Sequence, residues 1–553
     1  MSAPEPVAQK YLSGPAGVLV GLLLAVAAWL LPVNLKSVSP ALLRGAGEGT
    51  PSVASFGRQL VESEKIGPAG LVAAAARAVG DPGAPALAQA ERGLIDRQPT
   101  FAAWGGWDPF LDPLFNLRNP TGYANSTPVL TFFIGEKARS TLRSYLEESG
   151  SIGVQSLLRL RDLAVTGRFT PASRPGGQPL DALILLTGLL YQGEHLSPPL
   201  QRELRGLAEA SWAQKSLGDL EPFFLDLLAL GRRLDWMQLS ELLRRTDGVK
   251  TVGEYAQLAR VAPDQFPLIY TAALFSDSAD RVASYLLQFG KTGAEDLRLA
   301  LGDGQGAVQQ LLLRQLPVNH RSGPALSSTA ALVLAHPQLM LALKYLGYFL
   351  GLYLILRGLD RWFVAPGGAA TAGGQAAPAR SAILALFLAI LAIVATEPFL
   401  LQAAPPSEYR VHLRLPMLAA SGVAPSSPAA PLPSMNSSTL ISIVIFALVQ
   451  VMMYFICLRK INQIAAEPIT PRLKLRLMEN EENLFDSGLY VGMMGTAAAL
   501  VLQVVGVIEP NLLAAYSSNL FGIVCVALVK IRHVRGFKRQ LILENEAAGV
   551  ATA

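Results

Sequence analysis

The sequence has few charged residues and very few cysteines. Only 16% of its 553 residues are charged, against roughly 25% in an ordinary soluble domain. This low charge excludes a disordered chain and a protein that wraps nucleic acid, because both need far more charge. The two cysteines, Cys457 and Cys525, lie in apolar runs. They therefore cannot form the disulfide framework of a small secreted domain.

Catalytic and metal-binding motifs are missing as well. The five histidines show no metal-ligand spacing. Gly290-Lys291-Thr292 is similar to the end of a phosphate-binding loop, but such a loop needs a glycine at position 285, which is Tyr. The sequence therefore predicts no enzyme, no metal site and no cofactor.

The sequence is rich in long apolar runs. A hydrocarbon core of about 30 Å requires roughly 20 apolar residues in a helix. Six stretches meet this length, namely 11–35, 338–356, 381–402, 439–458, 487–508 and 511–529. The sequence therefore predicts a six-helix integral membrane protein with a large part outside the membrane.

Basic residues flank alternate ends of these helices. Lys and Arg are frequent at 357–380, 459–476 and 530–539, whereas the alternate loops hold only Arg410 and Arg414. By the positive-inside rule, both termini are cytoplasmic and residues 36–335 lie outside, in the periplasm of a bacterial inner membrane. The first helix is an uncleaved anchor or a signal peptide cleaved near Ala27. We favour the anchor because its apolar run continues through Leu31.

The exterior part is expected to be helical, which makes the predicted fold class all-α. Residues 36–130 form a Gly/Pro-rich segment with short helices, and residues 131–325 show apolar spacing typical of helices with breaks at Gly or Pro. Stacked helical hairpins, a solenoid-like array, explain this pattern. An aromatic patch runs from Trp104 to Tyr123. We interpret it as the packed plug of a loop, with a surface for a partner or glycan as the alternative.

The remaining chain divides at two low-complexity linkers. The predicted units are an anchor at 1–35, helices two and three at 336–403, a Pro/Ser-rich linker at 404–437, the last three helices at 438–540 and a cytoplasmic tail at 541–553. Lys344 and Glu397 are charges inside the apolar helices. Both are near outer ends, where we expect their side chains to reach the headgroup region. A small transporter using these two charges is therefore the least favoured reading.

The last two apolar helices carry small and polar residues in a pattern. Gly488, Gly492, Gly495 and Ala499 form a stripe that lets another helix approach closely. Polar residues inside a membrane helix commonly face a partner helix or a water-filled path. The polar residues of these two helices are Thr496, Gln503, Ser517, Ser518 and Asn519, and Gly522 follows them in the last helix.

These two helices resemble the MotA/TolQ/ExbB proton-channel family. The segment Gly492-Met493-Met494-Gly495-Thr496-Ala497 is similar to the family's Gly-Leu-Leu-Gly-Thr-Val motif, and 515–523 is similar to its Ala-x-x-Ala-Thr-x-x-Gly motif. Asn519 stands where the family has Thr. The connector at 459–486 is shorter than the family's cytoplasmic domain, and the Pro that commonly precedes the glycine motif is absent.

The resemblance implies a stator-like subunit of a proton-driven motor. It implies a homopentamer whose pore is lined by Thr496, Asn519, Ser518 and Gln503 and packed through the glycines and Ala499. A single-helix partner of the ExbD/TolR/MotB type would supply the protonatable carboxylate, and the exterior array would contact envelope proteins in the periplasm. The alternative is a membrane-anchored periplasmic scaffold that conducts no ions.

Overall fold

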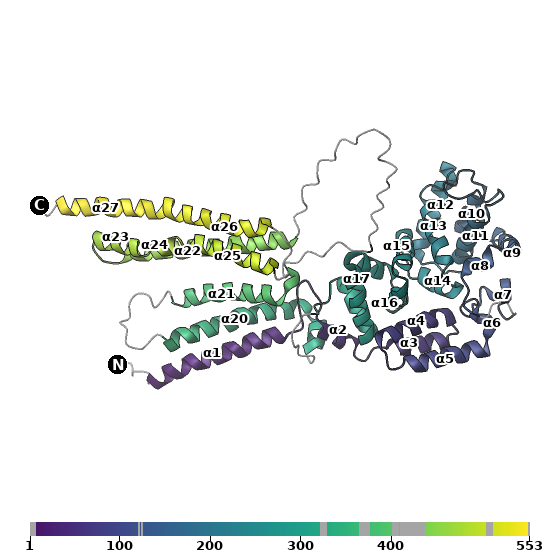
Figure 1. The fold of residues 1–553 in the computed structure, drawn as a ribbon, viewed down its shortest axis with the longest axis horizontal. Helices are drawn as coiled ribbons and strands as arrows, with labels where there is room; N and C mark the ends of the chain where they lie inside the picture. Colours follow the sequence, from purple (N-terminus) through teal and green to yellow (C-terminus); the bar gives the residue numbers. More distant parts are fainter. Residues whose placement is uncertain are drawn as a thin grey trace.

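The computed structural model describes residues 7–119, 122, 125–320, 329–363, 377–400, 409, 437–504 and 512–550. Every regular element in these residues is a helix, apart from two isolated bridges, Val38–Val318 and Val165–Ser216. The predicted all-α class is confirmed. Figure 1 shows a helical array on one side and a set of long helices on the other.

The array contains the shorter helices. Their bounds are α2 (Pro40–Gly47), α3 (Val53–Glu62), α4 (Ile66–Val79), α5 (Ala84–Arg97), α6 (Pro99–Ala102), α7 (Asp112–Phe115), α8 (Val129–Phe133), α9 (Glu136–Glu147), α10 (Ile152–Arg159), η1 (Leu160–Asp162), α11 (Gln178–Gln192), α12 (Pro198–Gln214), α13 (Leu220–Gly231), α14 (Trp236–Leu243), α15 (Val249–Val261), η2 (Pro263–Gln265), α16 (Phe266–Ser276), α17 (Ala279–Asp303), α18 (Gln305–Arg314) and α19 (Ala330–Ala335). Gly290 has φ 58° inside α17, so the segment resembling a phosphate-binding loop is a kink between two helical pieces.

The array is not a solenoid, which corrects the sequence-based expectation. In a solenoid, each repeat contacts only its neighbours. Here α4 packs against α14, α16 and α17, and α2 packs against α17 and α18. One hydrophobic core runs from Val33 to Met340 and includes Tyr409, so it crosses the boundary predicted at residue 130. Regular periodicity alone could not reveal this, because helices that pack locally and helices that pack at long range share the same apolar spacing.

The aromatic patch is packed inside the array, as we interpreted it. Trp104 is buried and stacks on Phe132 with ring centroids 3.9 Å apart. Phe115 and Phe133 complete the cluster. Tyr123 lies outside the described residues.

The long helices form two groups. The N-terminal trio consists of α1 (Val7–Leu30), α20 (Pro337–Phe363) and α21 (Ala377–Thr396), and η5 (Pro398–Leu400) follows it. The C-terminal trio consists of α22 (Ser437–Ala466), α25 (Ser487–Val504) and α26 (Leu512–Ala527). Beyond it lie α23 (Pro471–Asn480), α24 (Glu482–Phe485), the π-helical stretch η7 (Leu528–Val534) and α27 (Arg535–Val550).

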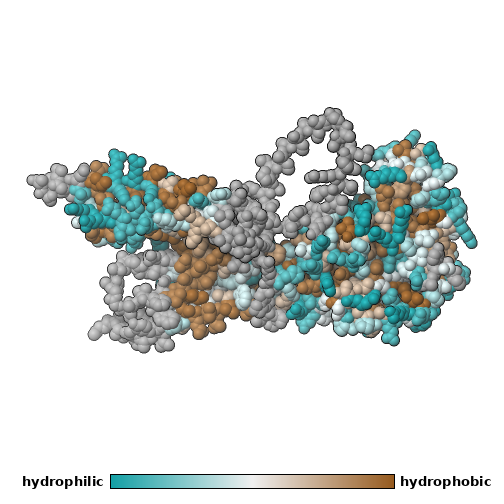
Figure 2. Space-filling model, in the orientation of Figure 1, coloured by the Kyte–Doolittle hydropathy of each residue, from teal (hydrophilic) through white to brown (hydrophobic). Residues whose placement is uncertain are grey.

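Both trios extend away from the array in the same direction. The start of α1 and the end of α27 lie at the end remote from the array (Figure 1). Hydrophobic residues gather on the trios between the array and the more hydrophilic α23 and α27 (Figure 2). Of the described residues, one helix, Pro337–Leu359, is long and apolar enough to cross a membrane, and Gly14–Leu30 and Ser381–Val394 are shorter apolar helices.

Glycines bring α1 and α20 into close contact. A Cβ atom on Gly21 would lie 2.5 Å from the carbonyl oxygen of Gly351, and one on Gly358 would lie 2.7 Å from that of Gly14. Neither backbone can retreat without separating the helices. The contact therefore depends on glycine at these positions.

Candidate functional site

A buried ion pair joins the N-terminal trio to the start of the array. The ammonium group of Lys344 on α20 lies 3.8 Å from the carboxylate of Glu397, which follows α21. The two side chains are only 3% and 1% exposed. Lys344 also donates to the carbonyl oxygen of Val33 at 2.6 Å and to the amide oxygen of Asn34 at 2.8 Å.

Glu397 holds the same segment from the other side. Its carboxylate accepts hydrogen bonds from the backbone N–H of Leu35 at 2.9 Å and from the hydroxyl of Tyr345 at 3.0 Å. The chain leaving α1 is thus fixed between a lysine of α20 and a glutamate at the end of α21. We call these groups (Lys344, Glu397 and residues 33–35) the clamp.

The clamp corrects the expectation that Lys344 and Glu397 extend separately toward headgroups. Both charges are near the ends of their helices, as predicted, but there the array and the trio cover them. A buried charge is tolerated when it is paired and its remaining hydrogen-bonding groups are satisfied. No local sequence pattern indicates this pairing, because the two residues are 53 positions apart.

The C-terminal trio contains most of the residues singled out in the sequence. A Cβ atom on Gly492 would lie 2.9 Å from the carbonyl oxygen of Ser518, and one on Gly522 would lie 2.6 Å from that of Gly488. A Cβ atom on Gly495 would meet the Ser518 hydroxyl at 2.3 Å. The glycines therefore form the contact between α25 and α26.

The polar residues of this trio differ in how they are bonded. The hydroxyl of Thr496 donates to Gly492 O in its own helix at 3.1 Å, and that of Ser518 donates to the same oxygen across the helix contact at 3.2 Å. The Oδ1 atom of Asn519 is buried and has no hydrogen-bond partner among the described residues. Ser518 thus lies between two helices of one chain, not on a free face of the trio.

A further polar residue, Gln450 on α22, was missed by sequence reasoning. Its amide nitrogen donates to the carbonyl oxygen of Gly488 at 3.0 Å, while its Oε1 atom is buried without a partner in the described part of the chain. A lone glutamine within the apolar run 443–458 was the available signal. The side chains of the predicted residues Ala499 and Gln503 lie outside the described residues, although both positions belong to α25.

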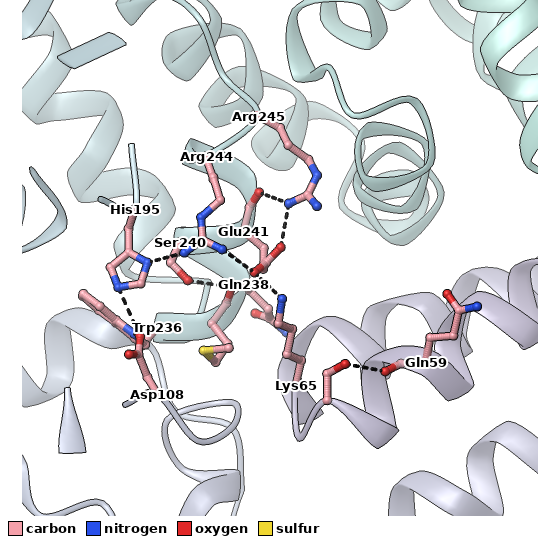
Figure 3. Close-up of polar contacts among 12 residues, drawn as sticks. Gln59, Lys65, Asp108, His195, Trp236, Gln238, Ser240, Glu241, Arg244 and Arg245 are labelled. Carbon is pink, nitrogen blue, oxygen red and sulfur yellow. Dashed lines mark hydrogen bonds and ion pairs between the residues drawn. The ribbon is translucent and has the colours of Figure 1, made fainter. Parts of the chain in front are cut away.

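The array contains a second cluster of polar groups, centred on α14 (Figure 3). The imidazole Nε2 of His195 lies 3.2 Å from Asp108, which also accepts a 2.6 Å hydrogen bond from the indole of Trp236. Arg244 lies 2.8 Å from Nδ1 of His195. Because arginine can only donate, Nδ1 must accept, and the imidazole proton therefore resides on Nε2, facing Asp108.

Glu241 is the other centre of this cluster. Its carboxylate pairs with Lys65 at 2.7 Å and with Arg245 at 2.6 Å. Lys65 comes from the turn between α3 and α4, so this contact joins the first helices of the array to α14. Burial alone would raise the pKa of Glu241, but the charges of Arg245 and Lys65 lower it.

Two aspartates of the array have opposite pKa shifts. Burial would raise the pKa of Asp108, but its contacts with His195 and Trp236 outweigh this effect and lower the pKa to about 2. Burial raises the pKa of Asp235 to about 7, although Ser126 and Gln238 partly offset it. Asp235 is the N-cap of α14, where its carboxylate accepts from the backbone N–H of Gln238 at 2.8 Å.

The cluster is built to hold helices together. A histidine beside an aspartate could activate a nucleophile, but Nδ1 of His195 faces Arg244, and the hydroxyl of Ser240 donates to Met237 O. Asp108, His195 and Glu241 are all buried. No group of three or more metal-ligating side chains occurs among the described residues.

Comparisons of the chain with protein-family models, with curated proteins and with solved structures give no match. The functional argument therefore depends on the geometry of the clamp, the C-terminal trio and the array.

Proposed function

We propose that this chain is an inner-membrane, stator-like subunit in which the six long helices cross the membrane and α25 and α26 line an ion pore. The array then lies in the periplasm, with both termini in the cytoplasm. The common direction of both trios and the hydrophobic band in Figure 2 support this topology. The glycine contact between α1 and α20 supports an uncleaved anchor, because removal of α1 would expose the glycine face of α20.

The observation that carries the pore proposal is the buried amide oxygen of Asn519, which has no partner among the described residues. A side-chain amide can accept a hydrogen bond from a protonated carboxyl group and donate one to a carboxylate. Asn519 therefore suits a partner's carboxyl group that alternates between these two states. Large apolar residues, including Met494, Tyr516 and Leu520, are exposed on the same two helices. They offer a surface for neighbouring copies and for a single-helix partner of the ExbD/TolR/MotB type.

The experiment measures proton flux through the complex purified from its native membrane and reconstituted in vesicles. Asn519→Leu and Thr496→Val should each lower the flux at least tenfold at normal expression. The matched control is Thr396→Val in α21, whose hydroxyl donates to Ala392 O at 2.8 Å, four residues back, as that of Thr496 does to Gly492 O. Unchanged flux in Asn519→Leu, or a purified monomer or dimer lacking a single-helix partner, would contradict the proposal.

A specific observation favours the second candidate, a membrane-anchored periplasmic scaffold. The clamp fixes the N-terminal trio to the chain that enters the array, an attachment suited to positioning a domain. The two functions can be distinguished by testing which variants complement a deletion of the gene. If a scaffold is sufficient, Asn519→Leu should complement the deletion as well as the wild type, whereas loss of the clamp through Lys344→Met should not.

A further inference from the structure

Three arginines surround one buried carboxylate at the end of the array remote from the trios. Asp181 lies in the first turn of α11, and its side chain is only 1% exposed. Its carboxylate is 2.8 Å from Arg139, 2.7 Å from Arg161 and 3.8 Å from Arg143. Arg139 and Arg143 belong to α9, and Arg161 belongs to η1. Both α9 and α11 lie on the side of the array that faces away from the long helices (Figure 1).

Arg139 is fully engaged by the chain. Its Nη1 atom donates to Asp181, its Nη2 atom pairs with Glu136, and its Nε atom donates to the carbonyl oxygen of Ile134 at 3.1 Å. A buried ion pair whose remaining hydrogen-bonding groups are satisfied holds one arrangement. Arg139 and Asp181 therefore form the fixed base of the cluster.

Arg143 and Arg161 keep donors that the chain does not use. Arg161 donates through Nε to Asp181, and the side chain of Arg143 donates no hydrogen bond among the described residues. The Nε atom of Arg143 is itself buried without a partner there, an arrangement that costs free energy. The side chain of Arg143 is 41% exposed overall, so an acceptor from solvent can reach its guanidinium group. An acceptor that turns this group toward itself would also satisfy the Nε atom.

The charge of the cluster is not balanced. Three guanidinium groups face two carboxylates, those of Asp181 and Glu136, so one positive charge is in excess. A carboxylate carries a single charge and accepts two parallel hydrogen bonds from a guanidinium fork. A phosphate monoester carries nearly two charges at neutral pH and would reverse the sign of the cluster. The charge balance therefore favours a carboxylate as the missing acceptor.

We propose that Arg143 and Arg161 bind one carboxylate group of the peptidoglycan layer. The inference rests on the periplasmic location of the array in the proposed function but not on ion conduction. In that topology the cluster faces away from the inner membrane, toward a polymer whose stem peptides carry carboxylates. The phosphate groups of the inner-membrane lipids lie at the opposite end of the array. A phosphodiester is the rival ligand, because it also carries a single charge.

The test measures co-sedimentation of the full-length protein, in detergent, with isolated peptidoglycan sacculi. The probes are untreated sacculi and sacculi whose carboxyl groups have been converted to amides. The wild type should bind untreated sacculi, and amidation should lower the apparent affinity roughly tenfold or more. Arg143→Gln should lower it by a similar factor, because it removes charge-assisted hydrogen bonds. The chain loses only the 3.8 Å contact with Asp181 in this variant, and circular dichroism should show an unchanged helix content.

The matched control is Arg205→Gln on α12. The side chain of Arg205 is 46% exposed, and its Nε atom is bonded to Glu209 at 2.8 Å, so this variant removes the same charge but no free donor. It should bind sacculi as the wild type does. Failure of the wild type to bind untreated sacculi, equal binding of amidated sacculi, or equal results for the two variants would overturn the proposal.

Two further outcomes separate this proposal from its rivals. Competition by phosphatidylglycerol vesicles for the site would identify a phosphodiester as the ligand and would overturn the assignment of a carboxylate. Normal binding to sacculi without proton flux would count against the pore and leave the carboxylate site standing. Proton flux without binding to sacculi would have the reverse meaning.

Discussion

The N-terminal and C-terminal trios both pack through glycine, but their buried polar groups differ in charge and in hydrogen bonding. In the N-terminal trio, the charges of Lys344 and Glu397 are buried, paired and surrounded by hydrogen-bonding partners from the chain itself. In the C-terminal trio, the buried polar groups are neutral, and the amide oxygens of Gln450 and Asn519 are buried without partners in the described residues.

The two trios illustrate two uses of a polar side chain in apolar surroundings. A paired charge fixes one arrangement, because either partner left alone is costly. A neutral amide without a partner costs less and leaves an atom available to an incoming group. We therefore propose that the N-terminal trio is a fixed attachment for the array and that the C-terminal trio is the place where a second molecule binds.

The largest effect is expected from breaking the clamp. Lys344→Met leaves the carboxylate of Glu397 buried and uncompensated, which should lower the free energy of unfolding by roughly 3–5 kcal/mol. Denaturant unfolding in detergent, with hydrogen exchange of α1 and α20, measures the loss. The double variant Lys344→Met/Glu397→Gln should recover much of it, because no unpaired charge remains.

A half-buried pair at the end of the C-terminal trio remote from the array provides the control for the clamp. Lys460 and Glu481 are 2.9 Å apart, with side chains 32% and 29% exposed. Lys460→Met should cost less than about 1 kcal/mol, since water screens such pairs. Equal losses for Lys344→Met and Lys460→Met would show that the clamp is not buried as described.

The stability of the array is expected to depend on pH through Asp235. The folded chain binds the proton of Asp235 with a pKa of about 7, against 3.8 for the free group. Unfolding therefore releases this proton between about pH 4 and pH 7, and the free energy of unfolding falls as pH rises through that range, by roughly 4 kcal/mol in all. Asp235→Asn should flatten this part of the profile and make the array more stable than the wild type at pH 8.

The pKa shift of Asp108 has the opposite sign to that of Asp235. Its folded-state pKa of about 2 means that its stabilisation is present above about pH 4 and is lost as pH falls toward 2. Asp108→Asn should therefore lower stability at neutral pH while keeping the slope between pH 4 and pH 7. A wild-type stability that rises from pH 4 to pH 7 would contradict the shift assigned to Asp235.

The glycine contact of the C-terminal trio is testable through the chain's own thiols. Cys457 and Cys525 are the only two cysteines, and both are buried in this trio. Gly522→Ala places a methyl group 2.6 Å from the backbone oxygen of Gly488, so the helices must separate. A cost of about 1–3 kcal/mol corresponds to thiol labelling that is roughly 5- to 150-fold faster.

Gly536→Ala on α27 is the matched control, because a Cβ atom there meets nothing within 4 Å. Its labelling rate should equal that of the wild type. Slow labelling in Gly522→Ala would show that α25 and α26 are not in the close contact described.

The sequence predicted the helical class and the positions of the long helices because apolar periodicity and run length are local signals. The glycine stripe of α25 was visible for the same reason. The glycines that α1 presents to α20 include Gly14, Gly17 and Gly21. They have similar spacing but belong to no known motif.

Contacts between distant segments were not predictable in this way. The pairing of Lys344 with Glu397 and the packing of α4 on α16 depend on which helices meet, and no local pattern encodes that. Tyr409 shows the limit most clearly: it lies in the stretch predicted to be a linker, yet it is buried against the array and its hydroxyl donates to Gln265 at 2.6 Å.

The smallest effect is expected at Gln450. Gln450→Leu removes the hydrogen bond to the carbonyl oxygen of Gly488, but it also removes a buried amide oxygen that has no partner in the described chain. The two changes oppose each other, so the cost should stay below about 1 kcal/mol, and labelling of Cys525 should change by less than roughly fivefold. An effect as large as that of Lys344→Met would mean that the amide oxygen of Gln450 is bonded in the assembled protein, and the C-terminal trio would then be as closed as the clamp.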